Sequence, residues 1–140
     1  MNAFLDTSSV LKLYHHESGT ETLNAALSQG VEEIYLSELA RLEFRSAIWK
    51  KTRTGEIDIE TANAVITCFQ QDEIKFQWIY LETDVIQQAE ELLMKYGATG
   101  LRTLDAIQLA SALTLKVQQN VRFFTADKLL KSFFKQEGLK

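Results

Sequence analysis

Proline is absent from the 140-residue sequence, and cysteine occurs only once. Average usage would give about seven prolines, so their absence favours a helix-rich chain with short connections. The single cysteine, Cys68, excludes an internal disulfide and is typical of a protein in a reducing cytoplasm. Within the segment VITCFQQ we interpret Cys68 as a core residue rather than a nucleophile.

Long hydrophobic runs and an excess of basic residues are also missing. The apolar runs are far shorter than the ~20 residues that a membrane-spanning helix needs, and the N-terminal MNAFLDTSSV lacks the basic start of a signal peptide. The formal net charge of −4 excludes a general basic coat for nucleic acid, but permits a local basic patch. We expect a cytoplasmic protein without a membrane segment, forming one domain over residues 1–140.

The polarity pattern predicts strands that alternate with helices. The predicted strands are NAFLD (2–6), EEIYLS (32–37), IKFQWIYL (74–81) and VRFFT (121–125). The predicted helices cover residues 8–17, 19–30, 38–52, 58–71, 83–97, 101–115 and 126–138, with Ser37, Asp58, Thr83 and Thr103 as caps. This alternation indicates an α/β fold with a mostly parallel sheet and helices on both faces.

Two aspartates follow predicted strands directly. Asp6 ends the first strand, and Asp127 lies two residues after Thr125 at the end of the fourth. In parallel α/β sheets, ligands bind beyond the carboxyl ends of the strands. Each aspartate alone is also explained as a helix N-cap, because aspartate is preferred there.

Two further carboxylates lie in apolar surroundings. Asp105 is the only charge between Thr103 and Leu115, and a first-turn acid favoured by the helix dipole explains it only in part. Glu43 lies mid-helix within the apolar arc at 100° per residue. A buried ion pair, for example with Lys50, is the alternative interpretation of Glu43.

Four carboxylates converging in one place would repel one another. Either their pKa values rise or a cation lies among them. Oxygen ligands suit hard divalent ions such as Mg²⁺ or Mn²⁺. With such ions a carboxylate cluster can approach an anionic phosphodiester and support its hydrolysis.

The segments FLDTSSVLKLY, LSELARLEFRSA, LRTLDAIQLASAL and FFTADKLL together resemble the four acidic motifs of PIN-domain ribonucleases. Within that group they are similar to VapC toxins of bacterial toxin–antitoxin pairs. The resemblance runs from Met1 to about Gly138. It implies a Rossmann-like sheet and a metal-dependent endoribonuclease that forms homodimers and binds a cognate antitoxin.

The resemblance also implies roles for particular residues. Asp6, Glu43, Asp105 and Asp127 would form the catalytic set, and Glu43 would orient the attacking water or assist its deprotonation. Asp6, Asp105 and Asp127 would hold Mg²⁺ or Mn²⁺. The hydroxyl residues that support the acids would be Thr7, Ser8 and Thr125.

One departure concerns the sheet. Family members usually continue past a glycine like Gly138 into a fifth strand, whereas this sequence ends at GLK. We therefore expect the strand order 3-2-1-4, with the fifth strand short or absent and an exposed edge on the fourth.

A cluster of basic residues follows Glu38. Arg41 and Arg45 are the candidates for contact with an RNA backbone, although a charged outer helix face is the ordinary alternative. Two other functions stay open for the whole chain: a non-catalytic binding module with this fold, and a phosphotransfer enzyme using Asp6 as nucleophile. Ser8 stands where such phosphatases usually carry a second aspartate.

Overall fold

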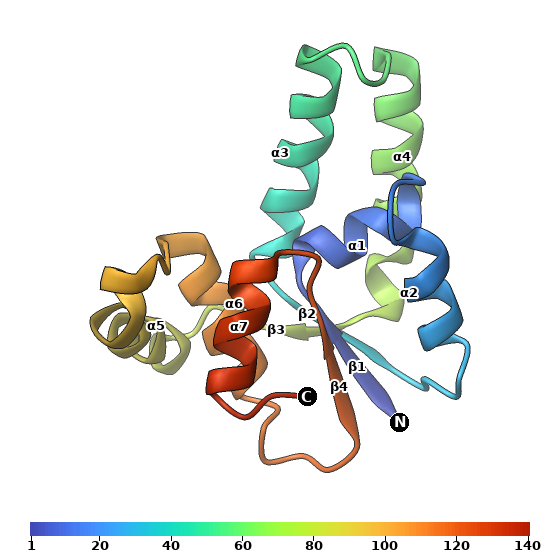
Figure 1. Cartoon of the computed structure of the whole chain (residues 1–140). Helices are drawn as coiled ribbons and strands as arrows, with labels where there is room; N and C mark the ends of the chain where they lie inside the picture. The colour runs from blue at the N-terminus through green and yellow to red at the C-terminus, as the bar shows by residue number, and fades with distance from the viewer.

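The computed structural model describes residues 1–140 and contains one parallel sheet with helices on both faces (Figure 1). The strands are β1 (Asn2–Leu5), β2 (Ile34–Ser37), β3 (Gln77–Ile79) and β4 (Val121–Phe124). The helices are α1 (Thr7–Tyr14), α2 (Thr20–Leu27), α3 (Ala40–Arg53), α4 (Ile59–Asp72), α5 (Thr83–Tyr96), α6 (Thr103–Leu113) and α7 (Lys128–Gln136), with short 3₁₀ turns at Glu73–Lys75 and Gly97–Thr99. None of the helices combines the length and the apolar character that crossing a membrane requires.

The sheet has the predicted strand order, β3-β2-β1-β4, and every pairing is parallel. β3 is shorter than predicted because residues 73–75 form a 3₁₀ turn after α4. The Trp78 indole stabilises that turn, since its Nε1 donates to the Glu73 carbonyl at 2.9 Å.

Alternation along β1 divides the core between the two faces of the sheet. Phe4 faces the cluster formed with α5, α6 and α7, whereas Ala3 and Leu5 face the cluster formed with α1 to α4. On the second face Phe44 of α3 stacks on Phe69 of α4 with ring centroids 4.0 Å apart. This packing fixes the start of α3, and with it Glu43, against the sheet.

The helix caps agree only partly with the predictions. Asp58 caps α4 as predicted, and its carboxylate accepts from the Thr61 N–H at 2.7 Å. The predicted caps Thr83 and Thr103 are wrong, because each is already the first helical residue and neither helix has a side-chain cap. Ser37 does not cap α3 either; Leu39 holds the N-cap position, and the Ser37 hydroxyl accepts from the Leu39 N–H at 3.3 Å.

The core assignment of Cys68 is wrong, because the side chain is exposed. The next residue of α4, Phe69, fills the core instead and is fully buried. Neighbouring helical residues point about 100° apart, so only one of the two can face the sheet.

β4 forms an edge of the sheet, and the end of the chain runs back beside it (Figure 1). Gly138, at φ +80°, takes the left-handed conformation that ends α7, and Leu139 then packs into the core. The Lys140 carbonyl accepts from the Phe123 N–H at 3.3 Å. No fifth strand forms, as expected, and only this contact covers the outer edge of β4 with backbone.

Candidate active site at the carboxyl edge of the sheet

The four predicted acids come from four different elements. Asp6 directly follows β1, and Asp127 precedes α7. Asp105 lies in the first turn of α6, and Glu43 lies in the first turn of α3. The prediction that Glu43 is mid-helix is wrong, because α3 begins only at Ala40. Burial raises the pKa of Asp105, and the negative charges of Asp127 and Glu43 raise it further. Asp105 therefore lies near both of these carboxylates, and the Thr125 hydroxyl links the Asp6 carboxylate to the backbone N–H of Asp127.

Asp6 is the most buried of the acids, with 3% of the residue exposed. Its Oδ1 accepts from the Ser8 hydroxyl at 2.7 Å and from the Ser9 N–H at 3.0 Å, and its Oδ2 accepts from the Thr125 hydroxyl at 2.5 Å. Burial raises the pKa of Asp6 to about 6, although these hydrogen bonds act in the opposite direction. Asp6 is thus the N-cap of α1 as well as a buried carboxyl group at the sheet edge.

The three hydroxyl residues predicted to support the acids all contact them or their loop. Ser8 and Thr125 donate to Asp6, and each also accepts a backbone N–H of the loop before α7, from Ala126 at 3.0 Å and from Asp127 at 3.1 Å. Thr7 donates to Glu43 Oε1 at 2.8 Å. These bonds tie the loop between β4 and α7 to the start of α1.

Glu43 is held by two neutral donors rather than by a cation. Besides Thr7, the amide of Gln108 donates to Glu43 Oε1 at 2.8 Å, while Oε2 has no partner in the protein. The ion pair with Lys50 does not form, so that interpretation is wrong. Gln108 was not predicted, although it is the only amide side chain of α6 and lies one turn after Asp105.

Asp105 is half-buried and has no hydrogen-bond or ion-pair partner in the protein. Its pKa is raised first by burial and then by the negative charges of Asp127 and Glu43, while Arg102 acts weakly in the opposite direction. No hydrogen bond or ion pair within the protein therefore compensates this carboxylate, and Arg102 is the one cation that acts on its pKa.

Asp127 caps α7, and its Oδ1 accepts from the Leu130 N–H at 2.9 Å. We expect Asp127→Ala to lower the free energy of unfolding by about 1 kcal/mol, because the helix loses its cap. Asp127→Asn keeps an oxygen at this position and should unfold near the wild-type midpoint. Urea unfolding in metal-free buffer compares the two, and equal destabilisation by both would contradict a capping role.

The four acids supply suitable donor atoms for a hard divalent cation, although their side chains are widely spaced. All are carboxylate oxygens, and Asp105 is unpaired beside two negative charges. No group of three or more His, Cys, Asp or Glu side chains is close enough together to hold a metal ion. By donor chemistry the residues fit such an ion, while the ligand set Asp6, Asp105 and Asp127 stays a prediction.

The two predicted RNA-binding arginines are already paired. Arg41 and Arg45 both donate to Glu73 at 2.9 Å, and the Arg41 guanidinium lies 4.1 Å from the centre of the Trp78 ring. The Glu73 carboxylate thus binds both arginines, and Arg41 also packs on Trp78 of β3. This arrangement favours a structural role that joins α3 to the turn after α4.

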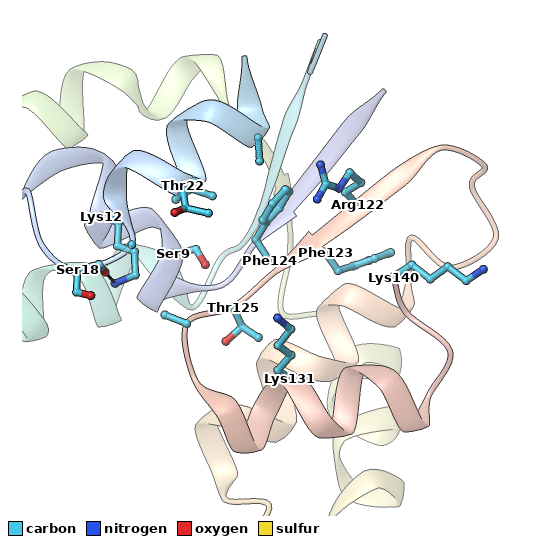
Figure 2. A pocket seen from close by; sticks show the side chains of 14 residues that line it. Ser9, Lys12, Ser18, Thr22, Arg122, Phe123, Phe124, Thr125, Lys131 and Lys140 are labelled. Carbon is cyan, nitrogen blue, oxygen red and sulfur yellow. Dashed lines mark hydrogen bonds between the residues drawn. The ribbon is translucent and has the colours of Figure 1, made fainter. Parts of the chain in front are cut away.

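A groove of about 720 Å³ lies beside the acids, between α2 and α7 at the free edge of β4 (Figure 2). Ser9 and Thr125, which both contact Asp6, line it, but none of the four acids does. Its charged lining residues are Lys12, Arg122, Lys131 and Lys140. These cations were not predicted, because they come from different elements and share no sequence pattern.

A model of the PIN domain family matches residues 3–133 of this chain. No curated protein sequence matches it. Among solved structures, Mycobacterium tuberculosis VapC20, described as a toxin that cleaves the sarcin-ricin loop, is 18% identical with a TM-score of 0.70, over 99% of this chain and 97% of that one.

Two toxin–antitoxin structures are similar as well. VapBC-1 from nontypeable Haemophilus influenzae is 15% identical with a TM-score of 0.65, over 100% of this chain and 96% of that one. A toxin–antitoxin complex from Klebsiella pneumoniae is 19% identical with a TM-score of 0.64, over 90% and 87%. At these identities the likeness establishes the fold.

Proposed function

The chain belongs to the PIN-domain family, and on that premise we propose that it is a metal-dependent endoribonuclease, the toxin of a toxin–antitoxin pair. The observation that carries the proposal is Asp105, a half-buried carboxylate without a hydrogen-bond or ion-pair partner in the protein, whose pKa is raised by burial and then by Asp127 and Glu43. A half-buried carboxylate without a donor or a cation beside it bears part of its cost of burial uncompensated. A divalent cation bound at this site would supply the missing compensation.

In this proposal Asp6, Asp105 and Asp127 hold Mg²⁺ or Mn²⁺. A divalent ion bound there would polarise the phosphate and neutralise charge on the leaving oxygen. The protein's own contribution is to keep the three carboxylates in place. Asp6 is fixed by Ser8, Ser9 and Thr125, while Asp127 is fixed by the first turn of α7.

Glu43 is the proton acceptor of the proposed reaction. Its Oε1 is occupied by Thr7 and Gln108, which leaves Oε2 free to take a proton from the attacking water. The water oxygen forms a bond to phosphorus, the bond from phosphorus to the leaving ribose oxygen breaks, and that oxygen takes a proton from solvent. The two hydrogen bonds aim the carboxylate without neutralising it.

The proposed partners follow from the same premise. Solved structures with this fold include toxin–antitoxin complexes, so we propose a cognate antitoxin, homodimer formation and a cytoplasmic location. The phosphotransfer alternative is not favoured, because Ser8 stands where such phosphatases usually carry a second aspartate.

Metal binding tests the proposal apart from any RNA. Calorimetric titration with Mn²⁺ should detect binding at millimolar concentration or tighter, and Asp105→Asn should weaken it strongly. Glu60→Gln, at an exposed acid of α4, is the control and should bind as the wild type does. A folded wild-type protein without Mn²⁺ affinity would favour the non-catalytic binding module instead.

A further inference from the structure

We propose that the groove between α2 and α7 is a binding site for single-stranded RNA that leads to the acidic site. This inference rests on the proposed function, and adds where the substrate strand lies. The groove is open along the edge of β4, and Figure 2 shows Arg122 beside Phe124 and Lys131 beside Thr125.

Charge is the first argument for this site. Four cationic side chains and no aspartate or glutamate line the groove, although the whole chain has a net charge of −4. Lys12 is engaged by Glu17 at 3.2 Å, but Arg122 and Lys131 form no ion pair. They are thus free to bind phosphates, unlike Arg41 and Arg45 on α3, which share Glu73.

Continuity with the acids is the second argument. Thr125 and Ser9 line the groove and at the same time hold the Asp6 carboxylate. A strand bound along the groove therefore passes the two residues that hold Asp6. An acidic peptide would satisfy the same cations, but a phosphodiester strand also explains why the groove opens beside carboxylates that suit phosphodiester hydrolysis.

The test is binding of a short fluorescein-labelled single-stranded oligouridine, followed by anisotropy in EDTA so that cleavage does not interfere. We expect Arg122→Glu with Lys131→Glu to weaken binding at least ~10-fold and to reduce the slope of log affinity against log salt by roughly 1.4, because two phosphate contacts are lost. The control, Lys50→Glu with Arg53→Glu, makes the same charge change at exposed, unpaired positions of α3.

Each other outcome is decisive. Unchanged binding in the groove variant, or an equal loss in the control, would overturn the proposal. Binding of polyglutamate without binding of RNA would assign the groove to an acidic peptide and overturn it too. A third outcome is that RNA binding depends on the groove but the wild-type protein never cleaves RNA. That outcome would contradict the proposed function and support the RNA-binding site.

We also infer that Gln108 is a positioning residue for Glu43, on independent observations. The Gln108 residue is only 3% exposed, and its Nε2 donates to Glu43 Oε1 at 2.8 Å and to the Thr7 hydroxyl oxygen at 3.0 Å. Its own Oε1 is buried without a partner. A buried amide oxygen without a partner costs free energy. In this position the Gln108 side chain links α1, α3 and α6 at the Glu43 carboxylate.

A double-mutant cycle tests the link without any cleavage. Gln108→Met removes the donor at similar volume, and Glu43→Met removes the acceptor. Since either change leaves buried polar groups unpaired, we expect the double variant to melt no lower than the less stable single variant. Additive losses in melting temperature would overturn the inference, whatever the enzyme does.

Cleavage kinetics separate positioning from packing. Gln108→Met should lower kcat roughly 10-fold or more with little change in KM, because a misplaced proton acceptor affects chemistry rather than binding. The exchange Gln108→Glu with Glu43→Gln keeps one carboxylate and one amide, and should recover the melting temperature but not cleavage. Recovery of both, or wild-type kcat in Gln108→Met, would contradict a positioning role.

Discussion

Asp105→Asn is expected to lower the rate of RNA cleavage by about 100-fold or more, while the protein stays folded. The change removes a predicted metal ligand, and several kcal/mol of charge stabilisation with it. It also removes a negative charge that Asp127 and Glu43 oppose. In metal-free buffer the melting temperature should therefore equal or exceed that of the wild type.

Cleavage of a labelled RNA panel with Mn²⁺, beside thermal melting in EDTA, measures both effects. Asp84→Asn is a matched control, because Asp84 is the first-turn acid of α5 as Asp105 is of α6. It should leave cleavage unchanged. If Asp105→Asn unfolds the protein while Asp6→Asn cleaves normally, the assignment of the site is wrong.

Asp6→Asn is expected to abolish cleavage and to change how stability depends on pH. The pKa of Asp6 is about 6 in the folded protein, against an ordinary 3.8, so between these values the folded state binds the proton more tightly than the unfolded state. The contribution of Asp6 to the free energy of unfolding is therefore complete below about pH 4, and it is lost as the pH rises through 6. The loss is at most about 3 kcal/mol.

Asparagine at position 6 retains an oxygen for the Ser9 N–H and carries no charge. In EDTA the variant should thus gain stability over the wild type as the pH rises from 4.5 to 7.5. Urea unfolding at several pH values gives the difference between the two proteins, which isolates Asp6 from other titrating groups. A wild-type protein that gains stability relative to the variant over this range would contradict the raised pKa.

The fold was largely predictable because its signals are local. The apolar segment NAFL, the alternation around Trp78 and the cap at Asp58 each depend on a few neighbouring residues, and the parallel order agrees with the prediction. The caps Thr83 and Thr103 failed because a hydroxyl at a helix start can occupy either the cap or the first turn. Cys68 failed because a one-residue shift around a helix exchanges core for solvent.

The site was predictable only for the residues whose chemistry marks them in isolation. A carboxylate in an apolar helix, such as Asp105, is conspicuous by its cost of burial. Gln108 is neutral, and its role arises from Glu43 lying across from it. Arg122 and Lys131 lie on a strand and a helix, and only the fold places both beside one groove. The pairing of Arg41 and Arg45 with Glu73 likewise depends on tertiary contacts.

The most direct test of the central claim is cleavage of a labelled RNA panel by the purified protein with Mn²⁺ or with EDTA, alongside Asp6→Asn. Metal-dependent hydrolysis at the four carboxylates predicts cleavage by the wild-type protein only when Mn²⁺ is present, and none by the variant. Cleavage that persists in EDTA, or that Asp6→Asn performs as well as the wild type, would contradict it.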